Sequence, residues 1–208
     1  MINNIIFDFD GVLVDSEILA GRAFSRYLAK FNIKLSEHEF MRTYAGNKLV
    51  EVVSDISSRF NIKDQDAFFE NVMALNQRIY MNELTAVSGV ENFLNVINQK
   101  KLIGSNSNKQ RIIDGLIKLN LIKYFNKKDI FSFDMVNIAK PNPAIYLKAI
   151  KVSGINPTET IIIEDSVVGV KAGIAANIKV IGLTSGGHWI GRSQQILLNA
   201  GAYAVAND

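Results

Sequence analysis

The chain has 208 residues, 48% of them hydrophobic, which is enough for one sizeable core or for a core with a small second domain. It carries 23 basic and 20 acidic side chains without a long basic run, which argues against nucleic-acid binding, and it has no cysteine for disulfides or thiolate catalysis. Asp8 and Asp10 interrupt the apolar start and no later stretch approaches about 18 apolar residues, so we expect a cytoplasmic protein with neither signal peptide nor membrane span.

Short apolar runs predict six strands. The first, at residues 5–9, and the fourth, at residues 160–163, both run into acidic residues. The other four are predicted at 101–104, 130–132, 179–183 and 202–205. Continuous runs of this length are typical of strands that are buried on both faces of a parallel sheet.

Apolar residues at helical spacing lie between these strands, around residues 90–97 and 112–117 and after Pro141 and Pro143. Strands that alternate with helices predict an α/β fold with a Rossmann-like parallel sheet. A closing helix would be expected after Val205, but the sequence continues for only three residues beyond it.

The first two predicted strands are separated by far more than the about 30 residues of a whole βαβ unit. Residues 16 to about 83 have helical patterning and contain no proline. We therefore predict an inserted α-helical cap at residues 16–85, with a Rossmann-like catalytic core made of residues 1–15 and 86–208.

Polar residues follow three of the predicted strands, and ligands of open α/β sheets bind beyond the carboxyl ends of strands. Lys140 precedes a predicted helix and could reach the same edge. The candidate site residues are Asp8, Asp10, Ser105, Asn106, Lys140, Glu164 and Asp165.

Four carboxylates at one edge would repel one another. At about 4 Å each like-charged pair costs on the order of 4 kcal/mol at an effective dielectric of about 20. Since one lysine does not offset this, the sequence predicts a divalent cation, and oxygen ligands favour Mg²⁺.

The same residues suit phosphoryl transfer. Ser105 and Asn106 precede a helix and could cradle a phosphate, while Lys140 could neutralise its oxygens. Asp8 could act as nucleophile and Asp10 as general acid and base. Each feature alone is also compatible with an exposed turn, a helix cap or a surface lysine. Their joint placement at strand ends, in this order along the chain, favours a catalytic site.

Residues 8–17 resemble the first motif of the haloacid dehalogenase-type hydrolase superfamily. Ser105-Asn106, Lys140-Pro141 and 164–166 resemble its remaining motifs, and the similarity covers nearly the whole chain. The resemblance implies a Rossmann-like core with a helical cap, with Asp8 as nucleophile and Asp10 as acid and base. It also implies which residues bind the metal ion and which bind the phosphoryl group of the substrate. Mg²⁺ would be held by Asp8, the Asp10 carbonyl and Asp165, with Glu164 close by, and the phosphoryl group by Ser105, Asn106 and Lys140.

The subgroup resembled is that of the β-phosphoglucomutase-like phosphatases, and residues 16–54 are most similar to bacterial 6-phosphogluconate phosphatases. Ala20 and Leu49 stand where mutases of this subgroup carry a histidine and a phosphate-binding arginine. Lys48 and Arg22 are candidate substrate contacts in the cap. A solvated Lys48 and an Arg22 whose stem packs on the core are the alternatives.

The function expected is that of a monomeric, Mg²⁺-dependent phosphatase acting on a small phosphorylated metabolite, a sugar phosphate or a 6-phosphogluconate-like compound. A β-phosphoglucomutase-type phosphomutase is the alternative, followed by a non-catalytic binding protein on the same fold. Residues 186–189, after the fifth predicted strand, could flank the mouth of the active site, but a flexible surface loop is the interpretation that we favour from the sequence.

Overall fold

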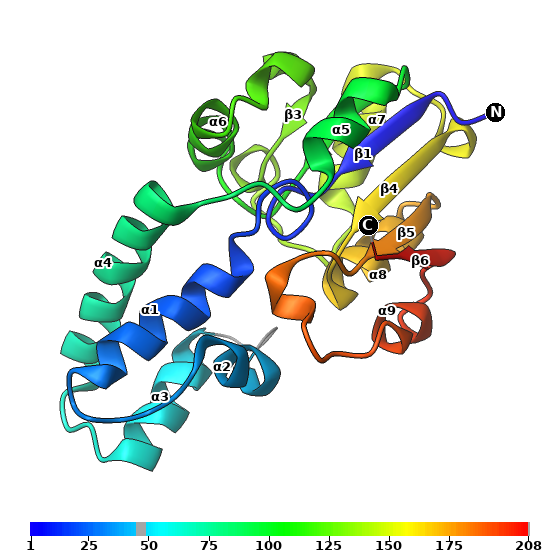
Figure 1. The fold of residues 1–208 in the computed structure, drawn as a ribbon. Coiled ribbons are helices and arrows are strands. Elements are labelled where there is room, and N and C mark those ends of the chain that lie inside the picture. Colours follow the sequence, from blue (N-terminus) through cyan, green and yellow to red (C-terminus); the bar gives the residue numbers. More distant parts are fainter. Residues whose placement is uncertain (45–48, 208) are drawn as a thin grey trace.

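The computed structural model describes residues 1–44 and 49–207 (Figure 1). Six strands form one sheet in the order β3-β2-β1-β4-β5-β6, and every neighbouring pair is parallel. The strands are β1 (Asn4–Phe7), β2 (Lys100–Gly104), β3 (Ile130–Phe131), β4 (Thr160–Glu164), β5 (Lys179–Leu183) and β6 (Ala204–Ala206). The predicted α/β fold with a parallel sheet is thereby confirmed.

The ends of two strands differ from the sequence prediction by two residues, and the other strand ends by one residue at most. β1 ends at Phe7, because the Phe9 carbonyl accepts hydrogen bonds from the backbone N–H groups of Leu13 and Val14 and turns the chain out of the sheet. β6 begins at Ala204, two residues later than predicted. Both differences lie at strand ends, which the apolar pattern defines least sharply.

Helices cover both faces of the sheet, as successive strand residues point to opposite sides. Phe7 belongs to a core shared with α5 (Val90–Val96) and α6 (Lys109–Lys118). Ile6 belongs to a second core, shared with three later helices. These are α7 (Ala144–Ser153), α8 (Val167–Ala175) and α9 (Gln195–Asn199).

Four helices lie between β1 and α5 and form one end of the molecule, away from the sheet (Figure 1). They are α1 (Glu17–Ala29), α2 (Glu37–Tyr44), α3 (Leu49–Phe60) and α4 (Gln65–Glu83). Phe24 of α1 stacks on Phe40 of α2 at 4.5 Å and meets Phe68 of α4 edge-on. The segment is helical as expected, and its division from the core at residues 16 and 85 stays a prediction.

The two chain segments that join these helices to the sheet run beside each other. The Asp15 N–H donates to the Thr85 carbonyl (2.9 Å), and the Val87 N–H donates to the Leu13 carbonyl (3.2 Å). Val14 and Ala86 form an antiparallel bridge between them. The helical segment therefore leaves and re-enters the sheet layer at one place.

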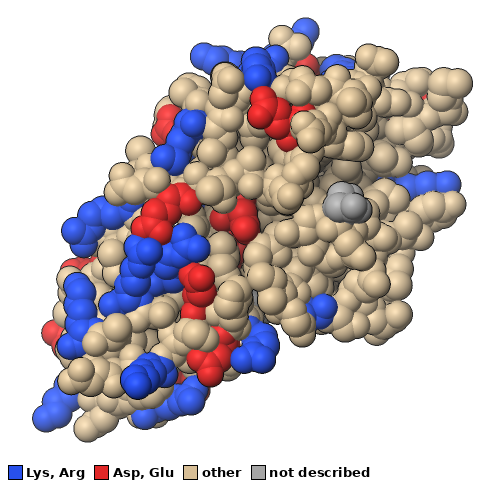
Figure 2. Space-filling view, viewed as in Figure 1, with Lys and Arg blue, Asp and Glu red and all other residues tan. Residues whose placement is uncertain are grey.

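Charged side chains of both signs gather over helices α1–α4 on the face shown in Figure 2. Among the residues that the structure describes, no helix is long and apolar enough to cross a lipid bilayer.

Candidate active site

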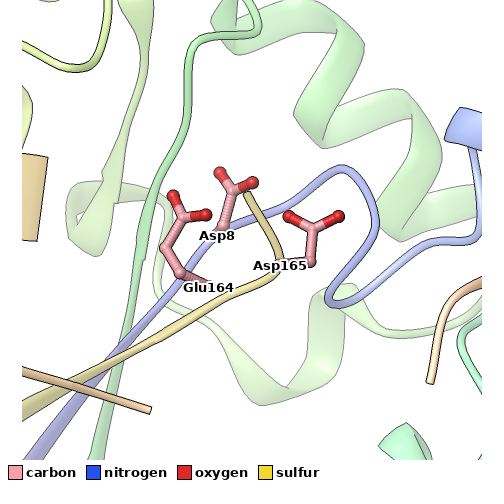
Figure 3. A group of neighbouring side chains, drawn as sticks. All are labelled: Asp8, Glu164 and Asp165. Carbon is pink, nitrogen blue, oxygen red and sulfur yellow. The ribbon is translucent and has the colours of Figure 1, made fainter. Parts of the chain in front are cut away.

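Three carboxylates meet where β1 and β4 end (Figure 3). Asp8 follows β1 directly, Glu164 is the last residue of β4, and Asp165 comes next. Oxygens of all three lie within 4.8 Å of one another, and all three residues are buried. The cause is the register, since Phe7 pairs with Ile163 and the strand order reverses between these two strands, which is where open α/β sheets bind ligands.

One lysine partly neutralises this cluster. The Lys140 Nζ lies 2.7 Å from Asp8 Oδ1 and 2.6 Å from Glu164 Oε1. Burial lowers the pKa of Lys140, but the charges of Asp8 and Glu164 outweigh it and the pKa stands well above its ordinary value. Lys140 is therefore a cation throughout the range in which proteins work.

The carboxylates themselves remain under electrostatic stress. Burial raises the pKa of Asp8 well above its ordinary value, although Lys140 acts in the opposite direction. Burial, followed by the charge of Glu164, does the same to the pKa of Asp165. Desolvated carboxylate oxygens that lack a full complement of positive charge fit a hard divalent cation such as Mg²⁺.

Glu164 lies behind the other two acids and holds Lys140. Its Oε1 also accepts from the Tyr146 hydroxyl (2.8 Å), and its Oε2 accepts from the Ser166 N–H and Oγ (3.2 and 2.9 Å). Gly169 makes this possible, because a Cβ there would lie 1.8 Å from the Glu164 carboxylate. With both oxygens engaged, Glu164 is better suited to positioning Lys140 than to binding a ligand.

Asp10 stands one turn beyond Asp8. Its Oδ1 accepts from the Ser16 Oγ at 2.6 Å and its Oδ2 from the Ser107 Oγ at 2.5 Å. Directly after Asp10, Gly11 adopts a φ of +80°, and a Cβ at this position would lie 1.8 Å from Asp165 Oδ2. The tight turn thus needs glycine both for its backbone conformation and for the close approach of Asp165.

Ser105 and Asn106 follow β2 beside these acids. The Ser105 Oγ accepts from the Ser107 N–H (3.0 Å), and Asn106 Oδ1 accepts from the Lys140 N–H (2.9 Å). The Asn106 amide group is thereby oriented with its NH₂ end left for a ligand. Asn108 then caps α6, as its Oδ1 accepts from the Arg111 N–H.

These residues surround a cleft of about 540 Å³. The predicted site residues that line it are Asp8, Asp10, Ser105, Asn106, Lys140 and Asp165. Glu164 is fully buried behind the cleft. Arg22 does not line the cleft, because its guanidinium pairs with Glu37 and Glu83, at 2.9 Å each. Lys48 lies outside the described residues, so the roles of Lys48 and Arg22 stay predictions.

The expectation of a flexible surface loop at residues 186–189 is wrong. His188 and Trp189 are each only 4% exposed and line the cleft. Trp189 Nε1 donates to the Asp165 carbonyl (3.1 Å), and His188 Nε2 lies 2.9 Å from Asp165 Oδ2. Two glycines suggested mobility, whereas a histidine and a tryptophan directly after the carboxyl end of a parallel strand were the signal for a site.

Sequence reasoning also missed Glu17 and Arg192, both of which line the cleft. The Glu17 side chain is exposed to the cleft, but the surrounding protein desolvates its carboxyl group. This desolvation, together with the negative charges of Asp165 and Asp10, raises the pKa of Glu17 to about 7. Its position at the start of α1 looked like that of an ordinary acidic residue in a first helical turn.

Two curated bacterial proteins resemble the chain over most of their length. The 6-phosphogluconate phosphatase of Escherichia coli is 31% identical over 180 residues, which are 86% of this chain and 81% of that protein. The phosphorylated carbohydrates phosphatase of Thermotoga maritima is 29% identical over 207 residues, which are 97% and 92% of the two chains.

A solved structure supports the same relationship. A Thermotoga maritima protein assigned as a β-phosphoglucomutase superposes with a TM-score of 0.82 at 27% identity, covering 99% of this chain and 94% of that one. The resemblance to β-phosphoglucomutase-like proteins is thus confirmed. The sequence profile of haloacid dehalogenase-like hydrolases matches residues 5–183, and the chain therefore belongs to that family.

Proposed function

We propose that the chain is a Mg²⁺-dependent phosphatase that hydrolyses a phosphorylated sugar or sugar acid through an aspartyl-phosphate on Asp8. The observation that carries the proposal is a buried carboxylate, Asp8, 2.7 Å from the Lys140 ammonium at the wall of a 540 Å³ cleft. The cleft is within the size range of small-molecule sites. The phosphatase activities of the two bacterial relatives support the reaction class.

In the first step, a carboxylate oxygen of Asp8 attacks the phosphorus, and the bond from phosphorus to the ester oxygen breaks. Asp10 gives its proton to the departing alcohol oxygen. The hydroxyls of Ser16 and Ser107, at 2.6 and 2.5 Å, keep the Asp10 carboxyl from rotating away.

In the second step, Asp10 takes a proton from water as that water attacks the phosphorus. The bond to Asp8 breaks, so that inorganic phosphate leaves and the free carboxylate of Asp8 is restored. Lys140 stabilises the negative charge on the phosphoryl oxygens in both steps, and Glu164 holds it in position. Ser105 and Asn106 orient the phosphoryl group.

Asp8, the Asp10 carbonyl and Asp165 would hold Mg²⁺, which would supply positive charge to the cluster and polarise the phosphoryl oxygens. His188 Nε2 lies 2.9 Å from Asp165 Oδ2 and holds this carboxylate in place, as the partner of a ligating carboxylate commonly does. A cytoplasmic location and a monomeric state are part of this proposal.

The test is release of phosphate by the purified protein from a panel of phosphorylated sugars and sugar acids in Mg²⁺. Turnover of at least one, abolished by Asp8→Asn, is expected. Failure to release phosphate from every compound and from p-nitrophenyl phosphate would instead favour a binding protein.

A phosphomutase is the second candidate, because of the similarity to the Thermotoga protein assigned as a β-phosphoglucomutase. Ala20 and Leu49 argue against it, since neither side chain can hold the second phosphate of a bisphosphate intermediate. With β-glucose 1-phosphate and a trace of the 1,6-bisphosphate, we expect phosphate and glucose. Efficient formation of glucose 6-phosphate without matching phosphate release would establish the mutase.

A further inference from the structure

The loop after β5 brings an arginine to the cleft. Arg192 follows the short 3₁₀ helix Gly187–Trp189 and is among the residues that line the cleft. Its guanidinium carbon lies 4.5 Å from the centre of the Trp189 ring, and the Arg192 backbone N–H donates to the Trp189 carbonyl (2.9 Å). Since Trp189 is itself bonded to the Asp165 carbonyl, the guanidinium is held at a set position relative to the carboxylate cluster.

Three basic side chains line the cleft, and two of them are engaged. Lys140 binds Asp8 and Glu164, and His188 binds Asp165. Within residues 1–44 and 49–207, no carboxylate lies within ion-pair distance of Arg192. Partial burial lowers the pKa of Arg192 despite the charges of Asp165 and Glu17, but an arginine side chain remains a cation.

A partly desolvated, unpaired guanidinium favours a planar oxyanion, to which it donates two parallel hydrogen bonds. The phosphoryl group already has Lys140, Ser105 and Asn106 as its proposed partners, so Arg192 is left for a second anionic group on the same substrate. Stacking on Trp189 keeps the guanidinium oriented, and this lowers the entropy lost on binding.

We propose that Arg192 binds the carboxylate of a phosphorylated sugar acid and makes the enzyme prefer such acids to neutral sugar phosphates. This inference rests on the proposed phosphatase function and adds its substrate class. It also places a determinant of specificity on the sheet-bearing part of the chain, rather than on helices α1–α4.

The test compares two six-carbon substrates that carry the same terminal phosphate. 6-Phosphogluconate ends in a carboxylate and glucose 6-phosphate in a neutral hemiacetal. We expect the wild type to show a kcat/KM at least about tenfold higher for the acid. Arg192→Ala should lower the ratio of the two kcat/KM values by about 10- to 100-fold, as expected for loss of a charge-assisted hydrogen bond. Arg192→Lys keeps the positive charge but cannot donate two parallel hydrogen bonds, so it should give an intermediate ratio.

Arg78→Ala is the matched control, because Arg78 is an exposed arginine on α4 outside the cleft, and its ratio should equal that of the wild type. If Arg192→Ala lowers kcat/KM equally for both substrates, or raises the Mg²⁺ concentration that activity requires, then Arg192 only offsets the negative charge of the acidic cluster. A wild type that prefers the neutral sugar would also overturn the inference.

Binding to the Asp8→Asn protein gives the same comparison without turnover. Calorimetry in Mg²⁺ should show a tenfold or greater loss of affinity for 6-phosphogluconate when Arg192→Ala is added, and a smaller loss for glucose 6-phosphate. If the wild type releases no phosphate but this binding difference is present, the catalytic proposal fails and the assignment of Arg192 stands. If both losses are equal, the assignment fails whatever the activity.

Discussion

Asp10 is the residue whose contacts define its proposed role most closely. Two hydroxyls hold its carboxyl group, and it lies beside Asp8 at the mouth of the cleft. Asp10→Asn should lower kcat by at least about 10²-fold, since an amide can neither give nor take the proton. Asp8→Asn should lower it further and prevent any covalent intermediate.

Both variants can be compared by p-nitrophenyl phosphate turnover and by acid quenching with radiolabelled substrate, which traps a phosphoenzyme. Asp114→Asn is the control, because that acid is exposed on α6 and accepts a hydrogen bond from its neighbour Gln110. Label bound to Asp8→Asn, or near-normal turnover by Asp10→Asn, would refute the two roles.

Replacing Glu17 by glutamine should stabilise the folded protein at high pH but not at low pH. Its pKa in the folded protein is about 7, against an ordinary value of 4.5, so ionisation opposes folding. The penalty is absent below about pH 4.5, grows between the two values and is complete above about pH 7. In EDTA, Glu17→Gln should therefore melt at a higher temperature than the wild type at about pH 8 and at the same temperature at about pH 4.5.

Thermal unfolding of both proteins across this pH range is the measurement. Glu91→Gln serves as control, because Glu91 is an exposed acid whose pKa is lowered by its hydrogen bond from Lys123. A Glu17→Gln protein that gains nothing at high pH would show that water in the cleft solvates the carboxylate fully.

At the scale of elements, Glu83 ties the last turn of α4 to α1. Its carboxylate accepts from Arg26 Nη1 and Nη2 (2.5 and 3.0 Å) and from Arg22 Nη1 (2.9 Å). Glu83→Gln should lower the free energy of unfolding by about 1 kcal/mol, the upper end for a single exposed pair, because two arginines lose their shared partner. Urea unfolding measures this.

The control for Glu83 is again Glu91→Gln, which breaks an exposed pair with a single cation, Lys123, and should cost less. Equal losses in the two variants would mean that the two-arginine network adds nothing. A change in substrate ranking in Glu83→Gln would instead connect Arg22 to the substrate, as the sequence predicts.

The sequence predicted the elements that local patterning controls. The strand before Asp8 and the strand before Glu164 were readable because buried parallel strands need continuous apolar runs. The sequence placed Lys140 near this edge but did not reveal its contact with Asp8, because that contact depends on hydrogen bonds that Lys140 donates to Asn106 and Glu164, which are distant in the chain. The burial of residues 186–189 was not predicted for the same reason, since Trp189 packs in the second core and bonds the Asp165 carbonyl, both formed by residues distant in the chain.

For the whole molecule, the carboxylate cluster predicts that Mg²⁺ stabilises the fold. Asp8 and Asp165 are desolvated acids, and binding of a cation to the folded state alone adds about 2.7 kcal/mol at a concentration 100 times Kd. Mg²⁺ should raise the melting temperature and restore activity after EDTA. Asp165→Asn should lose most of the shift and Asp114→Asn none, and full turnover after rigorous chelation would contradict the proposed metal dependence.

The paired crossings between Leu13–Asp15 and Thr85–Val87 have a consequence for how such a chain can change over time. Because the helical segment begins and ends at neighbouring, hydrogen-bonded positions, a turn of a few residues could replace it without altering the strand order. Helices of another length or sequence could be grafted at the same place. The proposed nucleophile, metal ligands and Arg192 contact would stay with the sheet-bearing part of the chain, while helices α1–α4 would be free to diversify.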